Sequence, residues 1–331
     1  MEHIKDNQEN GNMIFKDTHH GEVAILLCCY NGERYIRAQL DSLVKQTYRP
    51  YTCYIHDGGS VDRTLEIIEE YITKYPRLFV KIQYENKSKG ACANFMSLLQ
   101  YARKHLNERY FMLCDQDDVW FPEKIKKSVQ SILRREIDGK PIMVYCEQII
   151  TDEHLKVLNK EKFLMKRKRA VDDTFKRIVF RNTAAGCTMA FNQVLLKMIC
   201  DIPDVDVLAM HDWWIMLMAS YYTRAYYIDE PLMMYRQHKD NTLGVDNNDW
   251  RRKLIKYTLD FGKSVKNRKE IVERCKNQLF LLKNMEMPGG RIGELEQAFR
   301  ILRIKNRMRR ALAFWHNGYV GLDNLFLLFF L

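Results

Sequence analysis

Residues 23–60 read VAILLCCYNGERYIRAQLDSLVKQTYRPYTCYIHDGGS, and this stretch decides the fold. An apolar run at Val23–Cys29 is followed by a segment of helical period at Glu33–Lys45 and by a second apolar run at Thr52–His56. A hydrophobic period that changes from strand to helix and back is typical of two parallel strands joined by a helix. We therefore predict that the chain begins its folded part with such a unit.

The same alternation continues to about residue 150. Further strands are expected at Phe79–Tyr84, Tyr110–Cys114 and Ile142–Cys146. Helices are expected at Val61–Lys74, Ala91–His105 and Pro122–Glu136. Repeated units of this kind predict the α/β class, with a Rossmann-like, mostly parallel sheet and flanking helices.

Beyond residue 150 the pattern weakens. Helices are expected at Ala170–Phe180, Asn192–Cys200 and His211–Tyr222, and strands at Ala225–Ile228 and Met233–Gln237. From Trp250 onward we predict two long basic helices separated by Pro288-Gly289-Gly290. Residues 1–21 are polar and aperiodic and are interpreted as a mobile leader.

The composition is that of a globular protein. The 331 residues are 47% hydrophobic and 29% charged, which argues against disorder and collagen. Residues 250–331 hold 18 Lys and Arg against 7 Asp and Glu, which accounts for the whole net charge of +11. No apolar run reaches the roughly 20 residues that span a bilayer, and no signal peptide is evident. The nine cysteines show no Cys-x-x-Cys pair, so we expect a reducing cytoplasm rather than a disulfide framework or a zinc cluster.

Polar residues follow two of the predicted strands. His56-Asp57-Gly58-Gly59-Ser60 offers a carboxylate, two glycines and a helix cap, which suits a polar ligand at a helix N-terminus or a simple capped turn. In Cys114-Asp115-Gln116-Asp117-Asp118, three carboxylates lie within four residues. Such a cluster is costly without a cation and favours Mg²⁺ or Mn²⁺, although a solvated acidic turn before a helix is the alternative.

Two later motifs carry further candidates. Asp212, in His211-Asp212-Trp213-Trp214, is either a helix N-cap or a general base whose pKa is raised by desolvation. Tyr235-Arg236-Gln237-His238 places a cation that pairs with phosphate beside an imidazole that binds metal. A lone histidine more often satisfies a local hydrogen bond.

The succession of these motifs resembles family 2 glycosyltransferases, in particular the bacterial branch that includes rhamnosyltransferases. The similarity covers about residues 23–245 and rests on ordered blocks: Cys28–Glu33, Gln39–Tyr48, Asp57–Thr64, Gly90–Phe95, Cys114–Trp120, Gly186–Asn192, His211–Trp214 and Tyr235–His238. The resemblance implies a GT-A fold over 22–245, with a nucleotide-sugar half (22–120), an acceptor half (121–245) and a basic helical extension (246–331). One departure is Gly58, where the family usually has a second Asp after Asp57.

The resemblance also implies an activity. The expected reaction is inverting, metal-dependent transfer of a sugar from a nucleoside-diphosphate sugar, dTDP-rhamnose or a UDP-hexose, to a hydroxyl of a cell-surface polysaccharide or lipid-linked glycan. Asp212 corresponds to the catalytic base, while Asp117 and His238 would bind a divalent cation, Mg²⁺ or Mn²⁺. Donor contacts are implied for Tyr30, Asn31, Glu33, Asp57, Asn94, Asp115 and Arg236. The acceptor side would be formed by Gly186, Cys187, Thr188, His211 and Trp213.

The basic C-terminal quarter suggests a further partner. Leu295, Phe299, Leu302 and Met308 alternate there with basic residues, a pattern that favours an anionic membrane surface or an ordinary packed helix with a solvated basic face. Our hypothesis is that residues 250–331 dock the enzyme on the cytoplasmic membrane. A sugar nucleotidyltransferase and a non-enzymatic nucleic-acid-binding protein are the alternatives. The sequence has neither the Gly-rich phosphate loop of a nucleotidyltransferase nor a recognised nucleic-acid-binding motif. We therefore expect no nucleic-acid partner.

Overall fold

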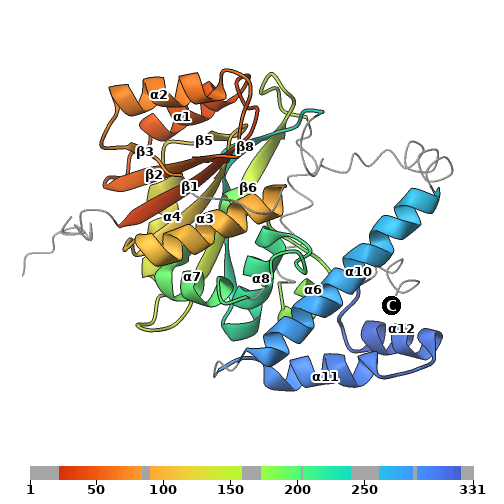
Figure 1. Ribbon diagram of the computed structural model, residues 1–331. Helices are drawn as coiled ribbons and strands as arrows, with labels where there is room; N and C mark the ends of the chain where they lie inside the picture. Colours follow the sequence, from red (N-terminus) through yellow and green to blue (C-terminus); the bar gives the residue numbers. More distant parts are fainter. Residues whose placement is uncertain are drawn as a thin grey trace, which may run out of the picture.

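The computed structural model describes residues 22–83, 90–158, 173–202, 204–239, 261–285 and 289–321. Within these residues, eight strands form one sheet in the order β3-β2-β1-β4-β7-β6-β8-β5 (Figure 1). The predicted leader, residues 1–21, lies outside the described part of the chain. The α/β class and the sheet with flanking helices are confirmed.

The first half of the sheet is parallel. Strand β1 pairs in parallel with both β2 and β4, and β2 pairs in parallel with β3. The elements are β1 (Val23–Cys29), α1 (Ile36–Val44), β2 (Tyr51–Asp57), α2 (Thr64–Lys74), β3 (Phe79–Lys81), α3 (Ala91–His105) and β4 (Tyr110–Asp115). Each helix returns the chain to the start of the next strand, as the alternating period predicts.

The second half is mixed. Strand β7 is antiparallel to β4 and β6, whereas β8 is parallel to β6 and antiparallel to β5. The elements are β5 (Val119–Trp120), α4 (Lys124–Leu133), β6 (Met143–Thr151), α6 (Phe175–Ile178), the 3₁₀ turn η2 (Gly186–Thr188), β7 (Met189–Asn192), α7 (Gln193–Ile199), α8 (His211–Tyr222) and β8 (Ala225–Arg236).

Strand β8 corrects one prediction. We expected two strands, Ala225–Ile228 and Met233–Gln237, but the structure has one continuous strand through Pro231. The register between β6 and β8 shifts where Glu147 faces Pro231. A proline cannot donate to a strand ladder and is tolerated at such an irregularity.

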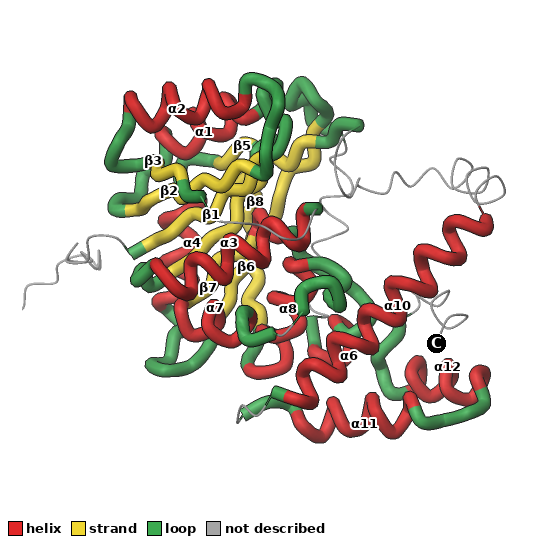
Figure 2. Tube along the Cα trace, viewed as in Figure 1, coloured by secondary structure: helices red, strands yellow, loops and turns green. Residues whose placement is uncertain are grey.

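Helices cover both faces of the sheet (Figures 1 and 2). One apolar core joins one face of the sheet to α3, α7 and α8, and the other joins the opposite face to α1, α2 and α4. Along β1, Ala24 and Leu26 belong to the first core, while Ile25 and Leu27 belong to the second. A strand buried on both faces reads as a continuous apolar run, which explains the sequence VAILLCC.

The C-terminal part contains three described helices, α10 (Phe261–Asn284), α11 (Ile292–Leu302) and α12 (Arg307–His316). The prediction of two long helices is therefore wrong at its second member, which is interrupted between α11 and α12. Asn306 begins the new helix, because its side chain accepts a hydrogen bond from the Arg309 N–H at 3.0 Å.

These helices pack against the part of the chain that contains the sheet rather than forming a separate core. Val272, Leu279 and Phe314 belong to the same apolar cluster as Trp214 of α8. The Arg291 guanidinium also donates to the Ser220 carbonyl at 3.0 Å. Removing α10 to α12 would expose part of the main core.

Candidate active site

The polar motifs gather at the carboxyl ends of three neighbouring strands. The register places Asp57, the last residue of β2, beside Cys29 of β1. On the other side of β1, Asp115 at the end of β4 lies beside Cys28. In open α/β sheets this edge is where ligands bind, so the strand order itself assembles the site.

The loop after β1 is fixed to the loop after β2. Asn31 has a positive φ of 47°, a conformation that asparagine tolerates better than most residues. Its N–H donates to the Ser60 hydroxyl at 2.8 Å, and its side-chain oxygen accepts from the Val61 N–H at 2.9 Å. Tyr30 is 56% exposed at the rim of this edge. The loop is therefore rigid and leaves one aromatic ring available for stacking.

Asp57 and Glu33 shape this loop. The Asp57 carboxylate accepts from the N–H groups of Gly59 and Ser60 at 3.0 and 2.9 Å, and also from the Ser60 hydroxyl. The Glu33 carboxylate accepts from the Arg63 N–H at 2.9 Å, just before α2 begins. These hydrogen bonds hold the loop in its conformation, and the helix that we expected to begin at Glu33 begins at Ile36.

Asn94 lies beside Gly58. A Cβ atom built on Gly58 would be 3.1 Å from the Asn94 amide nitrogen and 3.3 Å from the Cys29 carbonyl oxygen. Asn94 is in the first turn of α3, where its N–H donates to the Gly90 carbonyl at 3.0 Å. The space beside residue 58, where the family usually has an acidic side chain, is bordered here by a neutral amide.

Gln116 is a residue that the sequence analysis missed. Its side-chain oxygen accepts from the Tyr30 N–H and its side-chain nitrogen donates to the Tyr30 carbonyl, both at 2.9 Å. This double hydrogen bond fixes the loop after β1 to the acidic loop after β4. The sequence shows only an amide between two carboxylates, and nothing in it indicates a contact across 86 positions.

Asp117 and His238 come together, as predicted. The His238 Nε2 atom lies 2.7 Å from the Asp117 Oδ2 atom. Arg236 holds this arrangement, because its Nε donates to the Asp117 carbonyl at 2.6 Å and its own N–H donates to the Asp118 carboxylate at 3.1 Å. The Arg236 side chain is buried, and its guanidinium lies 4.7 Å from the Tyr35 ring centre. In this structure Arg236 fixes the backbone of the acidic loop.

The acidic cluster carries unfavourable charge. Burial, and then the charge of Asp117, raise the pKa of Asp115 to about 7. Burial also raises the pKa of Asp118 well above its usual range, and the charges of Asp117 and Asp115 add to this effect. One oxygen of Asp118 is buried without a hydrogen-bond partner among the described residues. A cation in this cluster would offset these costs.

Lys124 was also missed, and it lies under the cluster. The side chain is fully buried, and its ammonium donates to the Cys187 carbonyl, lies 3.2 Å from the Met233 sulfur and sits 3.6 Å from the Trp120 ring centre. Its charge opposes the upward shift of the Asp115 pKa. Lys124 thus connects α4 to η2 and supplies positive charge from beneath the site.

Asp212 lies in the first turn of helix α8. Its carboxylate accepts from the Trp213 N–H at 2.6 Å, and the Gly186 N–H and the Asn182 side chain also hydrogen-bond to it. Burial nevertheless dominates and raises the pKa of Asp212 to about 6. The Asp212 charge also contributes to the raised pKa of Asp115, so the two carboxyl groups lie close enough to interact.

The two tryptophans that follow Asp212 are each fixed by a hydrogen bond from the indole N–H group. The Trp213 indole donates to the Ile178 carbonyl at 2.7 Å, and the Trp214 indole is fully buried and donates to the Ile199 carbonyl at 2.9 Å. Both indole N–H groups therefore hydrogen-bond to backbone carbonyls outside this turn. Burial of the whole helix N-terminus removes water from Asp212.

The turn η2 borders Asp212 and His211. A Cβ atom on Gly186 would lie 2.9 Å from the His211 Nε2 atom and 3.5 Å from the Asp212 Cβ atom, so only glycine fits without a shift. The His211 ring stacks on Phe95 at 4.4 Å, and burial lowers its pKa to about 3, which keeps the ring neutral. The Thr188 hydroxyl donates to the Ala185 carbonyl at 2.6 Å and stabilises the turn.

The residues at this edge fit a hard divalent cation. Asp115, Asp118 and Cys187 place ligand atoms within 4.8 Å of one another, and Asp117 and His238 form the adjacent pair. Burial raises the pKa of the Cys187 thiol well above its usual value. Thiolate sulfur is a soft ligand, which hard cations such as Mg²⁺ bind poorly. Carboxylate oxygens with one imidazole are suited to Mg²⁺ or Mn²⁺ rather than to a thiolate-bound metal.

The comparisons with known proteins identify the family. The family profile of Glycosyl transferase family 2 matches residues 24–197, more than half of the chain, and the protein belongs to that family. It is an enzyme that transfers a sugar residue. The alternatives of a sugar nucleotidyltransferase and a nucleic-acid-binding protein are set aside.

Among curated relatives, the chain is 28% identical over 230 residues to dTDP-rhamnosyl transferase RfbG of Shigella flexneri, covering 66% of this chain and 74% of that protein. It is 26% identical over 227 residues to the uncharacterized glycosyltransferase RT0329 of Rickettsia typhi, covering 69% and 67%. These relatives confirm the resemblance to bacterial rhamnosyltransferase-like members of the family.

Solved structures confirm the GT-A fold. Residues 1–349 of TarS from S. aureus, in complex with UDP, align with a TM-score of 0.54 at 16% identity, covering 83% of this chain and 69% of that one. The mannosyltransferase PcManGT from Pyrobaculum calidifontis, in complex with GDP-Man and Mn²⁺, aligns with a TM-score of 0.52 at 14% identity, covering 94% and 86%.

Proposed function

We propose that the protein transfers a sugar from a nucleoside-diphosphate sugar to an acceptor hydroxyl with inversion at the anomeric carbon. One observation carries this proposal. Asp212, with a pKa raised to about 6, borders Gly186, and the next residue, Cys187, lies with Asp115 and Asp118 in one group whose ligand atoms are within 4.8 Å of one another. This placement supports a role for Asp212 as general base, beside the residues that would hold the diphosphate.

The donor would lie across the ends of β1, β2 and β4. The exposed Tyr30 ring is available to stack on the base, and the Asn31–Asp57 loop system fixes the position of that ring. Asn94, beside Gly58, adds an amide that is able to hydrogen-bond a pyrimidine edge. Asp115 would accept hydrogen bonds from the ribose or the sugar.

The diphosphate end of the donor would lie at Asp117 and His238. A bound divalent cation would stabilise the negative charge that develops on the departing diphosphate. Asp117 and His238 would hold the cation, and Arg236 would position both of them by fixing the acidic loop and the end of β8. Because these groups are held before the donor binds, little reorganisation is needed during the reaction.

Asp212 would act as the general base. It accepts the proton of the acceptor hydroxyl while that oxygen forms a bond to the anomeric carbon, and the bond from this carbon to the diphosphate oxygen breaks on the opposite face. The Gly186–Thr188 turn, His211 and Trp213 would line the acceptor side. A single displacement of this kind inverts the anomeric centre and forms no covalent enzyme intermediate.

For the substrates, we propose dTDP-rhamnose or a UDP-hexose as donor and a growing cell-surface polysaccharide or lipid-linked glycan as acceptor. The similarity to a dTDP-rhamnosyl transferase supports the first donor. A lipid-linked acceptor would bring the enzyme to the inner face of the cell membrane. None of the described helices is long and apolar enough to cross a bilayer.

A thermal-shift panel tests the donor and the cation together. UDP-, dTDP- and GDP-sugars are each added with and without Mn²⁺, and the matching donor is expected to raise the Tm more when Mn²⁺ is present. Purified Asp117→Asn and Asp212→Asn variants are expected to remain folded and to lose transfer, whereas Asp138→Asn, on an exposed loop, retains it. Near-wild-type turnover in either site variant would remove that residue from the mechanism.

A further inference from the structure

Helix α12 has an apolar arc that is wider than its contact with the core. Ala311 and Phe314 are buried against the protein. Met308, Leu312 and Trp315 remain 76%, 53% and 45% exposed. Their spacing of four and three residues places these three side chains on one stripe of the helix. Half of the apolar arc therefore faces outward.

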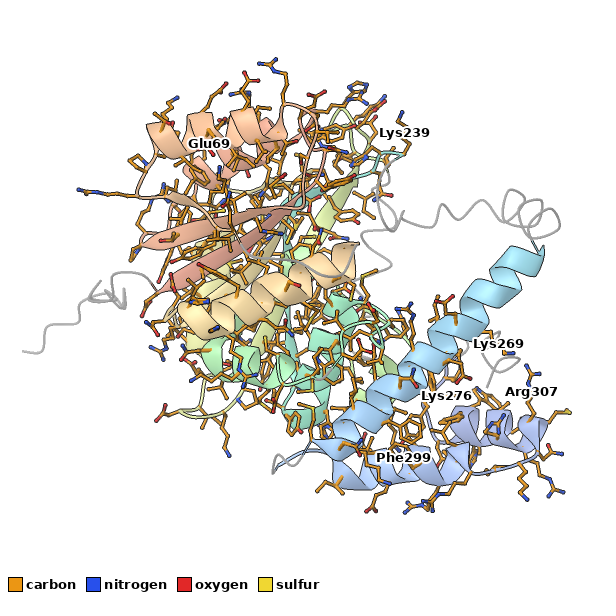
Figure 3. All side chains as sticks on the ribbon, in the orientation of Figure 1. Glu69, Lys239, Lys269, Lys276, Phe299 and Arg307 are labelled. Atoms are coloured by element: carbon orange, nitrogen blue, oxygen red, sulfur yellow. The ribbon has the colours of Figure 1, made fainter. Side chains whose placement is uncertain are left out.

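The helix is held firmly in this orientation. The Phe314 ring packs edge-on against Phe180 at 5.2 Å and against Tyr319 at 5.5 Å. The Gln297 side chain of α11 donates to the Asn317 side chain at 2.7 Å. Figure 3 shows Arg307 at the outer end of α12, away from the sheet. The exposed stripe is thus a fixed feature of the surface.

The structure corrects our choice of membrane anchors. Leu295 and Phe299 are buried, and the Phe299 ring packs against Phe280 at 4.9 Å between α11 and α10 (Figure 3). Leu302 is half-buried. These residues lie on the inward face of α11, so the prediction that they contact a membrane is wrong. Of the four, Met308 alone is exposed.

Positive charge surrounds the stripe. Residues 300–310 contain six Lys and Arg, and residues 297–322 contain no Asp or Glu. The exposed cations nearest to the stripe in sequence are Arg303, Lys305, Arg307 and Arg309. Within the described part of the chain, none of these four has a carboxylate within ion-pair distance. Their charge is available to an external anionic partner.

We propose that α12 docks the enzyme on the surface of an anionic phospholipid bilayer. Met308, Leu312 and Trp315 would enter the boundary between headgroups and acyl chains, and the surrounding cations would contact lipid phosphates. A fixed helix with an exposed apolar stripe, flanked by unpaired cations, has the two properties by which interfacial helices bind membranes. Trp is also favoured at this depth because its ring is apolar and its N–H is polar.

The charge pattern favours lipid over the other partners that an apolar stripe accepts. A second copy of this chain would present the same positive charge, and the two copies would repel each other. A nucleic acid would satisfy the cations but would leave Met308 and Leu312 without an apolar partner. Of these three partners, the anionic bilayer satisfies both parts of the surface.

Vesicle flotation of the full-length protein tests this proposal. Vesicles of phosphatidylcholine with about one third phosphatidylglycerol are compared with phosphatidylcholine alone, and binding is expected only to the former and to weaken at high salt. Met308→Ser with Leu312→Ser is expected to reduce partitioning about tenfold or more. The matched control is Val61→Ser with Ile137→Ser, two exposed apolar residues in the loops before α2 and after α4, which should leave binding unchanged.

Trp315 reports the contact directly. In the wild type, the emission is expected to shift to shorter wavelength when anionic vesicles are added. In Trp315→Phe the shift should be lost while flotation persists, because phenylalanine keeps an apolar side chain in the stripe. Replacing Arg307 and Arg309 by Gln should weaken flotation, whereas the same change at the exposed Lys45 and Lys140 should not.

Several results would overturn the proposal. Equal binding to neutral and anionic vesicles excludes charge recognition, and unchanged flotation of the Met308/Leu312 variant excludes the stripe. A dimer that dissociates in that variant identifies a second copy as the partner, and retention on DNA without flotation identifies a nucleic acid. A Trp315 shielded from iodide quenching without vesicles shows that the chain itself covers the stripe. Transfer to a soluble acceptor is measured separately, so loss of membrane binding does not count against the proposed reaction.

Discussion

The exchange of Asp212 for Asn is expected to increase stability while abolishing transfer. Burial raises the pKa of Asp212 from 3.8 in the unfolded chain to about 6 in the folded protein. Each pKa unit corresponds to about 1.4 kcal/mol, so carrying the charge at this site costs about 3 kcal/mol at neutral pH. Asparagine is nearly the same size and has no charge to desolvate.

The pH dependence fixes the sign of this effect. Below pH 3.8 the carboxyl group is protonated in both states and costs nothing. As the pH rises toward 6, the unfolded chain releases its proton first, and the wild type loses stability until the folded group is also ionised. The cost is therefore about half its full size at pH 5 and complete at pH 7.5.

Thermal and urea denaturation of the two proteins measure the effect. Asp212→Asn also weakens the hydrogen bonds from the Trp213 and Gly186 N–H groups, so we expect a net gain of about 1–3 kcal/mol at pH 7.5, or a few degrees in Tm, and a smaller gain at pH 5. In the wild type, the transfer rate should rise about tenfold between pH 5 and pH 7 as the base becomes ionised. A variant that gains no stability, or whose gain is independent of pH, would show that the carboxylate carries no desolvation cost.

Three other perturbations test separate parts of the site. Asp117→Asn and His238→Ala, which remove the two members of the 2.7 Å pair, should each weaken Mn²⁺ binding about tenfold or more, measured by Mn²⁺ titration in the presence of nucleotide. In Gly186→Ala the new methyl group would lie 2.9 Å from the His211 ring, so the urea midpoint should fall by the equivalent of about 1–3 kcal/mol, and an unchanged midpoint would mean that the turn moves freely. Lys124→Met leaves a buried backbone carbonyl without its donor and should cost about 1–3 kcal/mol, whereas the same change at an exposed lysine of α4 should have little effect.

The elements nearest to the site were predicted well from the sequence. The bounds of β1, Val23–Cys29, and of the helices Ala91–His105 and His211–Tyr222 are the same in the structure. Strand β1 is buried on both faces, α8 is buried over most of its surface and α3 has a strongly apolar face, so the apolar pattern is strong and its limits are sharp. The prediction of strand β8 was wrong because Pro231 interrupts the apolar pattern. In the structure, the shift in register between β6 and β8 accommodates the proline.

Some features of the candidate site could be predicted from the sequence and others could not. The positions of Asp57 and Asp115 at strand ends follow from the sequence, because parallel strands end at one edge. The contacts of Gln116 with Tyr30 and of Lys124 beneath the acidic loop do not, since each joins residues far apart in the chain and either side chain alone has no distinctive pattern. The roles of the site residues stay predictions for the experiments above.

The sequence by itself determined the alternation of strands and helices, the carboxylates that follow the strands and the excess of positive charge in the last quarter of the chain. The tertiary structure decided that Asp117 faces His238 across 121 positions, and that α11 turns Leu295 and Phe299 inward while α12 turns Met308 outward. The reason is that a hydrophobic period specifies which side of a helix is apolar. Only the packed fold specifies whether that side meets the core or the solvent.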